Sequence, residues 1–270
     1  MTSDRLRTAQ AVAREAARTA LPFHRDRGLA GWAKEDGSVV TRADLATEER
    51  IREVLAELAP GEAVLGEEYG LDGRPDGGRW IVDPIDGTEN FRRGSPFWGT
   101  LLAWCEGTGP SVAVVSAPSL GRTWWAELGR GAHTDGGRRL AVSEVGELRD
   151  ASFAFGGVHE YPVAPLRELA AFASTCRTAW GIGNFLGHVQ VAEGITDGAL
   201  SYGASPWDLA APALIVAEAG GTWSDLDGEP TLDRGSLLTS NGRLHRTLRT
   251  GVHRALHPEP ADRTTEEPQP

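Results

Sequence analysis

Acidic residues stand at the ends of short apolar runs, and this placement restricts the fold more than any other feature of the chain. Residues 63–65 and 80–82 are apolar, strand-like segments. Glu67 follows the first of them, and Asp83 and Asp86 follow the second. Ligands of α/β proteins tend to bind beyond the carboxyl ends of strands. The pattern therefore predicts an α/β fold whose strands bring carboxylates to one edge of a sheet.

Hydrophobic periodicity predicts the remaining elements. Helices are expected over residues 4–25, 42–58, 165–173, 185–193, 207–219 and 243–256. Residues 100–143 contain short β-rich runs between Gly, Pro and Asp turns, which predicts an antiparallel meander. Its strands are expected at residues 101–104, 112–117, 123–126 and 139–142, and further strands at 152–155, 222–224 and 236–239.

The segment WIVDPIDGTENF at residues 80–91 offers a set of oxygen ligands. The carboxylates of Asp83 and Asp86, with the carbonyl of Ile85 between them, form a compact oxygen cage of the kind that Mg²⁺ prefers. Pro84 restricts Asp83 to extended geometry, which helps to turn both carboxylates to one side. The residues thus predict a divalent metal site.

The residues after this cage favour an anion beside the metal. Gly87 and Thr88 open a short helix, whose backbone N–H groups would face the anion. Far downstream, Asp208 begins another apolar helix. A single Asp in such a place is ordinarily a solvated turn residue or a helix cap. Packing does not require carboxylates to recur at element ends, so the recurrence favours function.

Charge and composition exclude several classes of protein. The chain has 270 residues, with 38 Asp and Glu against 27 Lys and Arg, and its net charge of −11 argues against nucleic acid binding. Cys105 and Cys176 lack the spacing of a zinc site or a disulfide framework. No apolar run approaches the roughly 18–20 residues of a membrane span. We expect a cytoplasmic protein that acts on a small anionic metabolite and has no membrane partner.

The joint pattern resembles the inositol monophosphatase superfamily of Mg²⁺-dependent, lithium-sensitive phosphomonoesterases. The likeness rests on the motifs GEE at residues 66–68, DPIDGTxNF at 83–91 and WD at 207–208, the last followed by an apolar helix and two glycines. Within the superfamily, the chain is most similar to actinobacterial histidinol-phosphate phosphatases, at residues 66–70, 93–103, 115–126 and 240–242.

The resemblance implies a layered α/β/α/β/α sandwich of the inositol monophosphatase and fructose bisphosphatase type. One phosphatase domain would span residues 1–256, with halves at about 1–150 and 151–256 that meet at the site, and residues 257–270 would form a disordered tail. By resemblance, two or three Mg²⁺ ions would bind Glu67, Asp83, the Ile85 carbonyl, Asp86 and Asp208. The superfamily also implies a homodimer, paired through the meander.

Catalytic roles follow from the same resemblance. Asp44 and Thr88 match the pair that orients and deprotonates the nucleophilic water, and Glu67 belongs with them in the catalytic set. Gly87 and Thr88 would bind the phosphate. Lys34 and Asp36 match a K-x-D pattern of the family.

The pocket that would hold the rest of the substrate departs from the nearest relatives. Asn184 stands where they usually have Asp, and Ser201 stands where they usually have a Glu, seven residues before the aspartate of the WD motif. Trp180 stands near a common Arg, and it could stack on the leaving group or pack in the core. Histidinol carries an amine, which a carboxylate would ordinarily bind, and Glu160 and Glu193 are the acids that could substitute.

Three functions therefore stay open. The leading one is a histidinol-phosphate-phosphatase-like enzyme. The second is a specialised phosphatase acting on a sugar, cyclitol or nucleoside monophosphate in a biosynthetic pathway, which Asn184, Ser201 and Trp180 favour. The third is a catalytically silent relative that binds a phosphorylated ligand, for which loss of a metal carboxylate would be expected.

Overall fold

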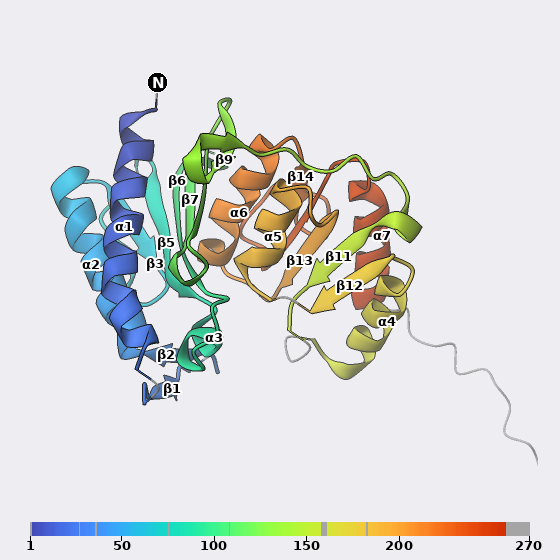
Figure 1. The fold of residues 1–270 in the computed structure, drawn as a ribbon, viewed down its shortest axis with the longest axis horizontal. Coiled ribbons are helices and arrows are strands. Elements are labelled where there is room, and N and C mark those ends of the chain that lie inside the picture. Colours follow the sequence, from blue (N-terminus) through green and yellow to red (C-terminus); the bar gives the residue numbers. More distant parts are fainter. Residues whose placement is uncertain are drawn as a thin grey trace, which may run out of the picture.

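Two large β-sheets and three layers of helices alternate through the molecule (Figure 1). The computed structural model describes residues 2–257 except residues 27, 36, 75, 108, 158–160 and 182. The helices are α1 (Asp4–His24), α2 (Arg42–Leu58), α3 (Thr88–Arg92), α4 (Val163–Ala173), α5 (Phe185–Ala192), α6 (Pro206–Glu218) and α7 (His245–Leu256). Helices α1 and α2 cover the first sheet, α5 and α6 lie between the sheets, and α4 and α7 cover the second sheet (Figure 1). This is the α/β/α/β/α sandwich expected from the sequence.

The first sheet has eight strands. In spatial order they are β10 (Arg138–Arg139), β9 (Gly131–Thr134), β8 (Arg122–Glu127), β7 (Gly109–Ala117), β6 (Gly99–Glu106), β5 (Arg79–Asp86), β3 (Ala63–Gly66) and β4 (Gly70–Asp72). Among these eight strands, only β3 and β5 pair in parallel. Trp80 and Val82 of β5 face α1 and α2, whereas Ile81 faces α5 and α6. The strand is apolar on both faces because helices cover both.

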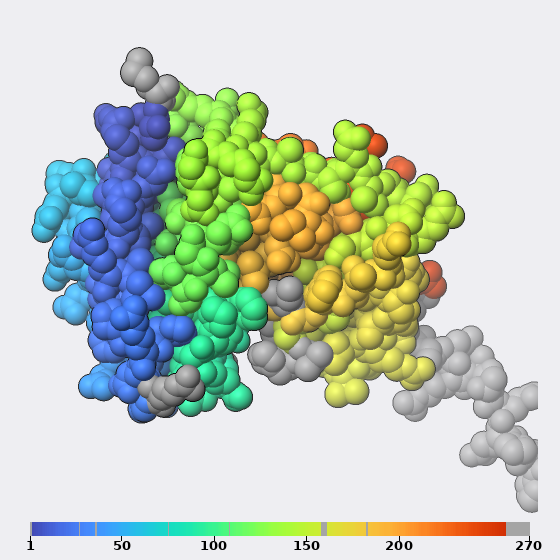
Figure 2. Space-filling view, viewed as in Figure 1, coloured from blue at the N-terminus to red at the C-terminus, as the bar shows by residue number. Residues whose placement is uncertain are grey.

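The second sheet has five strands and completes the sandwich. In spatial order they are β12 (Thr178–Gly181), β11 (Ser152–Phe155), β13 (Gly198–Tyr202), β15 (Ser236–Ser240) and β14 (Thr222–Ser224). Ala154 and Ala199 face α5 and α6, whereas Phe153 and Leu238 face α4 and α7. Figure 2 shows the orange segment, which includes α5 and α6, between the blue-to-green first half and the yellow part of the second half.

The six longer helices lie within a few residues of their predicted bounds. The strand predicted at residues 139–142 is wrong beyond Arg139: the meander ends in β9 and the two-residue β10, and the N–H of Val142 donates to the Ala219 carbonyl after α6. The strands β4, β9, β12 and β13 and the small hairpin of β1 (Gly31–Ala33) and β2 (Val39–Thr41) were not predicted from the sequence. No helix in the described part of the chain is long and apolar enough to cross a membrane. The predicted tail lies outside the described residues except for His257, as do Asp36 and Glu160.

Candidate active site

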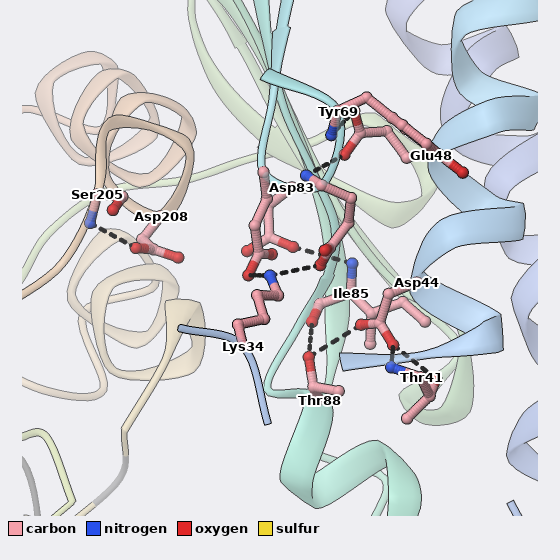
Figure 3. Close-up of polar contacts among 12 residues, drawn as sticks. Lys34, Thr41, Asp44, Glu48, Tyr69, Asp83, Ile85, Thr88, Ser205 and Asp208 are labelled. Atoms are coloured by element: carbon pink, nitrogen blue, oxygen red, sulfur yellow. Dashed lines mark hydrogen bonds and ion pairs between the residues drawn. The ribbon is translucent and has the colours of Figure 1, made fainter. Parts of the chain in front are cut away.

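Three carboxylates from the two halves of the chain converge where the halves meet. Asp83 and Asp86 lie at the carboxyl end of β5, Asp208 lies in the first turn of α6, and one oxygen of each lies within 4.8 Å of the others. Figure 3 shows Asp83 and Asp208 on the two sides of this site. In a regular strand, residues three apart point to opposite faces. Here β5 has one extra residue against β6 between Asp83 and Asp86, and such a bulge lets both side chains turn to the same side.

Glu67 joins this group because β3 runs parallel to β5. Its backbone N–H donates to the Val82 carbonyl, which places Glu67 beside Asp83. The Lys34 ammonium donates to Glu67 Oε1 and to Glu68 Oε1, each at 2.8 Å (Figure 3). Burial alone would lower the pKa of Lys34, but these two hydrogen bonds raise it, so the side chain stays charged. Burial raises the pKa of Glu68 to about 7.

Asp44 and Thr88 contact each other next to the carboxylate group. Thr88 Oγ1 lies 2.9 Å from Asp44 Oδ1 and 3.1 Å from the Ile85 carbonyl, so its proton has two acceptors. The other Asp44 oxygen accepts from the N–H and the hydroxyl of Thr41, at 2.8 and 2.6 Å. Burial raises the pKa of Asp44. The hydroxyl oxygen of Thr88 can still accept a hydrogen bond from a water molecule.

The same local device orients a carboxylate in each half. Asp44 is the third residue of α2, and its carboxylate accepts from the N–H of the capping Thr41. Asp208 is the third residue of α6, and its Oδ2 accepts from the N–H of the capping Ser205 at 2.6 Å. Such capping fixes the side chain relative to its helix. The sequence shows both capping positions, since the cap and the Asp are three residues apart.

The carboxylate group fits a hard divalent cation. Burial raises the pKa of Asp83 well above its usual range, and the charges of Glu67, Asp86, Asp208 and Asp44 add to this effect. Such crowding of buried like charges is unfavourable unless a cation compensates it. All the candidate ligands are carboxylate or carbonyl oxygens, which suit Mg²⁺ rather than softer metals. The residues predicted from the sequence to hold metal thus lie together.

A buried acid that the sequence analysis missed holds the turn after Glu67. Glu48 of α2 accepts from the N–H groups of Glu68 and Tyr69, at 2.7 and 3.3 Å, and from Arg52 Nε at 2.9 Å (Figure 3). A Cβ at Gly66 would overlap the Glu48 carboxylate, which explains why this turn needs a glycine. The available signal was the spacing of four residues from Asp44 to Glu48 to Arg52, which puts all three on one helix face.

The start of α5 connects the second half to the metal ligands. The N–H of Phe185 donates to Asp86 Oδ2 at 2.6 Å. Asn184 caps α5 with its Oδ1, adopts a positive φ of 79°, and donates from Nδ2 to the Phe97 carbonyl at 2.9 Å. With ψ at −175°, this conformation lies outside the left-handed helical region and is strained for any residue other than glycine, so the hydrogen bonds of Asn184 must hold it in place. Asn184 therefore lies at the junction, where it bridges the two halves.

Three other residues singled out in the sequence have defined surroundings. Ser201 Oγ lies 2.8 Å from His188 Nε2. Trp180 is half exposed on the edge strand β12, and its N–H donates to Ser152 at the start of β11, away from Asn184. Glu193 is nearly buried and forms ion pairs with two guanidinium groups, from Arg122 and Arg138. Its carboxylate is thus already neutralised within the protein.

Comparison with known proteins extends the likeness over both halves. The model of the inositol monophosphatase family matches residues 3–260. The histidinol-phosphatase of Mycobacterium tuberculosis is 45% identical over 227 residues, which cover 82% of this chain and 86% of that protein. The histidinol-phosphatase of Streptomyces coelicolor is 41% identical over 256 residues, covering 91% and 95%. The solved structure of an IMPase from Thermotoga maritima superposes with a TM-score of 0.85 at 28% identity, covering 94% of this chain and 98% of that one.

Proposed function

The chain belongs to the inositol monophosphatase family, and on this basis we propose that Glu67, Asp83, Asp86 and Asp208 hold Mg²⁺ for the hydrolysis of a small phosphate monoester. It is a phosphatase, since the matching family and the histidinol-phosphatase relatives share that activity. The observation that carries the metal assignment is the convergence of Asp83, Asp86 and Asp208 within 4.8 Å.

The contacts of the site residues suggest a separate role for each of them in the reaction. Bound Mg²⁺ would activate water and stabilise negative charge on the phosphate and the leaving group. Thr88 would accept a hydrogen bond from the attacking water while its own hydroxyl donates to Asp44 Oδ1, so the pair would orient the nucleophile and relay its proton to Asp44. Backbone N–H groups at Gly87 and Thr88, at the start of α3, would bind the phosphate. Lys34 keeps Glu67 and Glu68 partly neutralised.

The test is metal dependence of the full chain on p-nitrophenyl phosphate. Activity should vanish with a chelator, return with Mg²⁺, and be inhibited by excess Ca²⁺, because Mg²⁺ demands a tight octahedral geometry that larger Ca²⁺ disturbs. Calorimetry should detect Mg²⁺ binding that Asp83→Asn removes. Glu57→Gln changes an exposed carboxylate on α2 and should leave both results unchanged. Full activity in chelator would refute the metal assignment, and Mg²⁺ binding without hydrolysis of any ester would favour a silent relative.

Two kinds of leaving group are candidates for the alcohol part of the substrate. Identity of 45% with a histidinol-phosphatase favours histidinol phosphate. Ser201 and the engagement of Glu193 by two arginines favour an uncharged alcohol instead, since neither offers a free carboxylate to an amine. Parallel assays with histidinol phosphate, inositol 1-phosphate and a nucleoside monophosphate would rank the candidates.

A further inference from the structure

A histidine at the end of α1 packs against the short helix that Thr88 begins. His24 is the last residue of α1, and its ring centre lies 5.2 Å from that of Phe91 in α3 and 5.4 Å from that of Trp98 (Figure 1). Phe91 and Trp98 are buried and meet edge to face at 4.7 Å. Phe91 is also the only buried residue of α3, which has five residues. The three rings therefore hold α3 against the end of α1.

The two ring nitrogens of His24 join separate segments of the first half. Nε2 lies 3.0 Å from the Ser95 carbonyl, and Nδ1 lies 3.3 Å from Ser119 Oγ, just after β7. A carbonyl can only accept, so Nε2 is the nitrogen that donates. Ser119 Oγ accepts from the Trp98 indole N–H at 2.8 Å, and its own hydroxyl can donate to Nδ1. With the proton on Nε2, every group in this series of hydrogen bonds has a partner.

The series leads back to α3 through Ser95. The Ser95 N–H donates to the Asn90 carbonyl of α3 at 2.9 Å, so the segment that His24 holds is bonded to the helix. At the other end of α3, Thr88 Oγ1 lies between Asp44 Oδ1 and the Ile85 carbonyl. A helix of five residues has too few internal hydrogen bonds to keep its place without outside contacts. The direction of α3, and with it the position of Thr88, thus depends on such contacts.

We propose that His24 is a positioning residue for the pair that activates water: by holding Phe91 and the Ser95 carbonyl, it keeps Thr88 within reach of Asp44. The inference rests on the proposed phosphatase function, in which this pair orients the attacking water. The hydrogen-bond and ring partners of His24 in the described part of the chain include no metal ligand. His24 should therefore affect turnover and leave metal binding unchanged.

Substitution of His24 tests the role in the full, Mg²⁺-loaded chain with p-nitrophenyl phosphate. His24→Phe keeps a ring beside Phe91 but removes both hydrogen bonds. The kcat should fall about 10-fold, since misplacement of a catalytic group by about 1 Å can cost about 10²-fold. KM and the Mg²⁺ affinity measured by calorimetry should stay close to those of the wild type. Wild-type kcat in His24→Phe would overturn the positioning role.

Two amide variants separate the two hydrogen bonds of the ring. His24→Gln can place an amide N–H near the position of Nε2 and should restore most of kcat. His24→Asn reaches only the position of Nδ1 and should not. This comparison gives the same test if His24→Phe does not fold, and equal kcat in the two amide variants would argue against the bond to Ser95 as the support of α3.

A double-mutant cycle shows whether His24 acts through Thr88. In the Thr88→Ala background, His24→Phe should cause no further loss of kcat, because residues that act as a unit are not additive. Loss of the same factor in both backgrounds would overturn the proposal, since a general loss of structure would act in that way.

The second half offers a matched control for the loss of an imidazole. His245 in α7 lies between the hydroxyls of Ser224 and Ser240, at 3.0 Å each. His245→Phe should lower Tm and leave kcat unchanged, and an equal loss of kcat in this variant would overturn the specific role of His24. An inactive wild type would refute the proposed function, whereas an active wild type whose losses multiply in the cycle would refute only this inference.

Discussion

The two halves of the molecule contribute chemically different surfaces to the same site. The first half supplies Glu67, Asp83, Asp86 and Asp44, all carboxyl groups fixed by strand ends, a bulge and a helix cap. Among the described residues, the second half supplies one carboxyl group, Asp208, together with neutral polar groups such as Ser201 and Asn184. The difference suggests that the first half determines the reaction and the second half determines which alcohol is accepted. Substitutions in the two halves should then change different kinetic quantities.

The largest effect is expected from Asp86→Asn in the first half. The amide oxygen can still accept from Phe185, but a carboxylate ligand is lost. Mg²⁺ affinity and turnover should fall together, by about 10⁴-fold or more, because several kcal/mol of charge stabilisation disappear. Calorimetry and kcat/KM for p-nitrophenyl phosphate and inositol 1-phosphate measure this. Both substrates should lose the same factor in kcat/KM, and an altered ratio would show that the two halves do not have these separate roles.

Thr88→Ala should separate metal binding from proton handling within the first half. The kcat should fall by about 10² to 10⁴, the usual contribution of a positioned acid or base, while Mg²⁺ binding is kept. Thr88→Ser retains the hydroxyl and is the matched control. Wild-type kcat in the alanine variant would exclude Thr88 and Asp44 as the pair that activates water.

How much of the structure can be predicted from the sequence depends on whether the contacts are local or distant along the chain. The helices α1, α2 and α6 and the Asp83–Asp86 cage could be found because periodicity, caps and short spacings encode them locally. The contact between His188 and Ser201 could not, because it depends on α5 packing against β13, a strand with few β-branched residues. The prediction of a strand at residues 139–142 was wrong for a similar reason, because the Val142 N–H makes a long-range hydrogen bond to the Ala219 carbonyl instead of pairing in the sheet.

Glu48→Gln tests whether the first half holds its metal ligands through buried supports. The amide can still accept from Glu68 but lacks the charge that pairs with Arg52. Mg²⁺ affinity should fall by about 10- to 100-fold, as is usual when a residue that supports a metal ligand is changed. The ratio of kcat/KM between p-nitrophenyl phosphate and inositol 1-phosphate should stay the same. Glu49→Gln, the next residue and exposed, should have no effect. Equal Mg²⁺ affinity in the two variants would argue against this support.

The smallest effect, and the sharpest comparison of the halves, comes from returning carboxylates to the second half. Asn184→Asp with Ser201→Glu should shift preference toward 2-aminopropyl and histidinol phosphates by about 10-fold, because a charge-assisted bond to the amine becomes available. Most of the shift should arise from Ser201→Glu. Asn184→Asp loses the bond to the Phe97 carbonyl and should cost about 1–3 kcal/mol of stability, visible as a lower Tm. If histidinol phosphate is already the best substrate of the wild type and the double variant is no better, the neutral second half does not select the alcohol, while the metal site of the first half is untouched by that result.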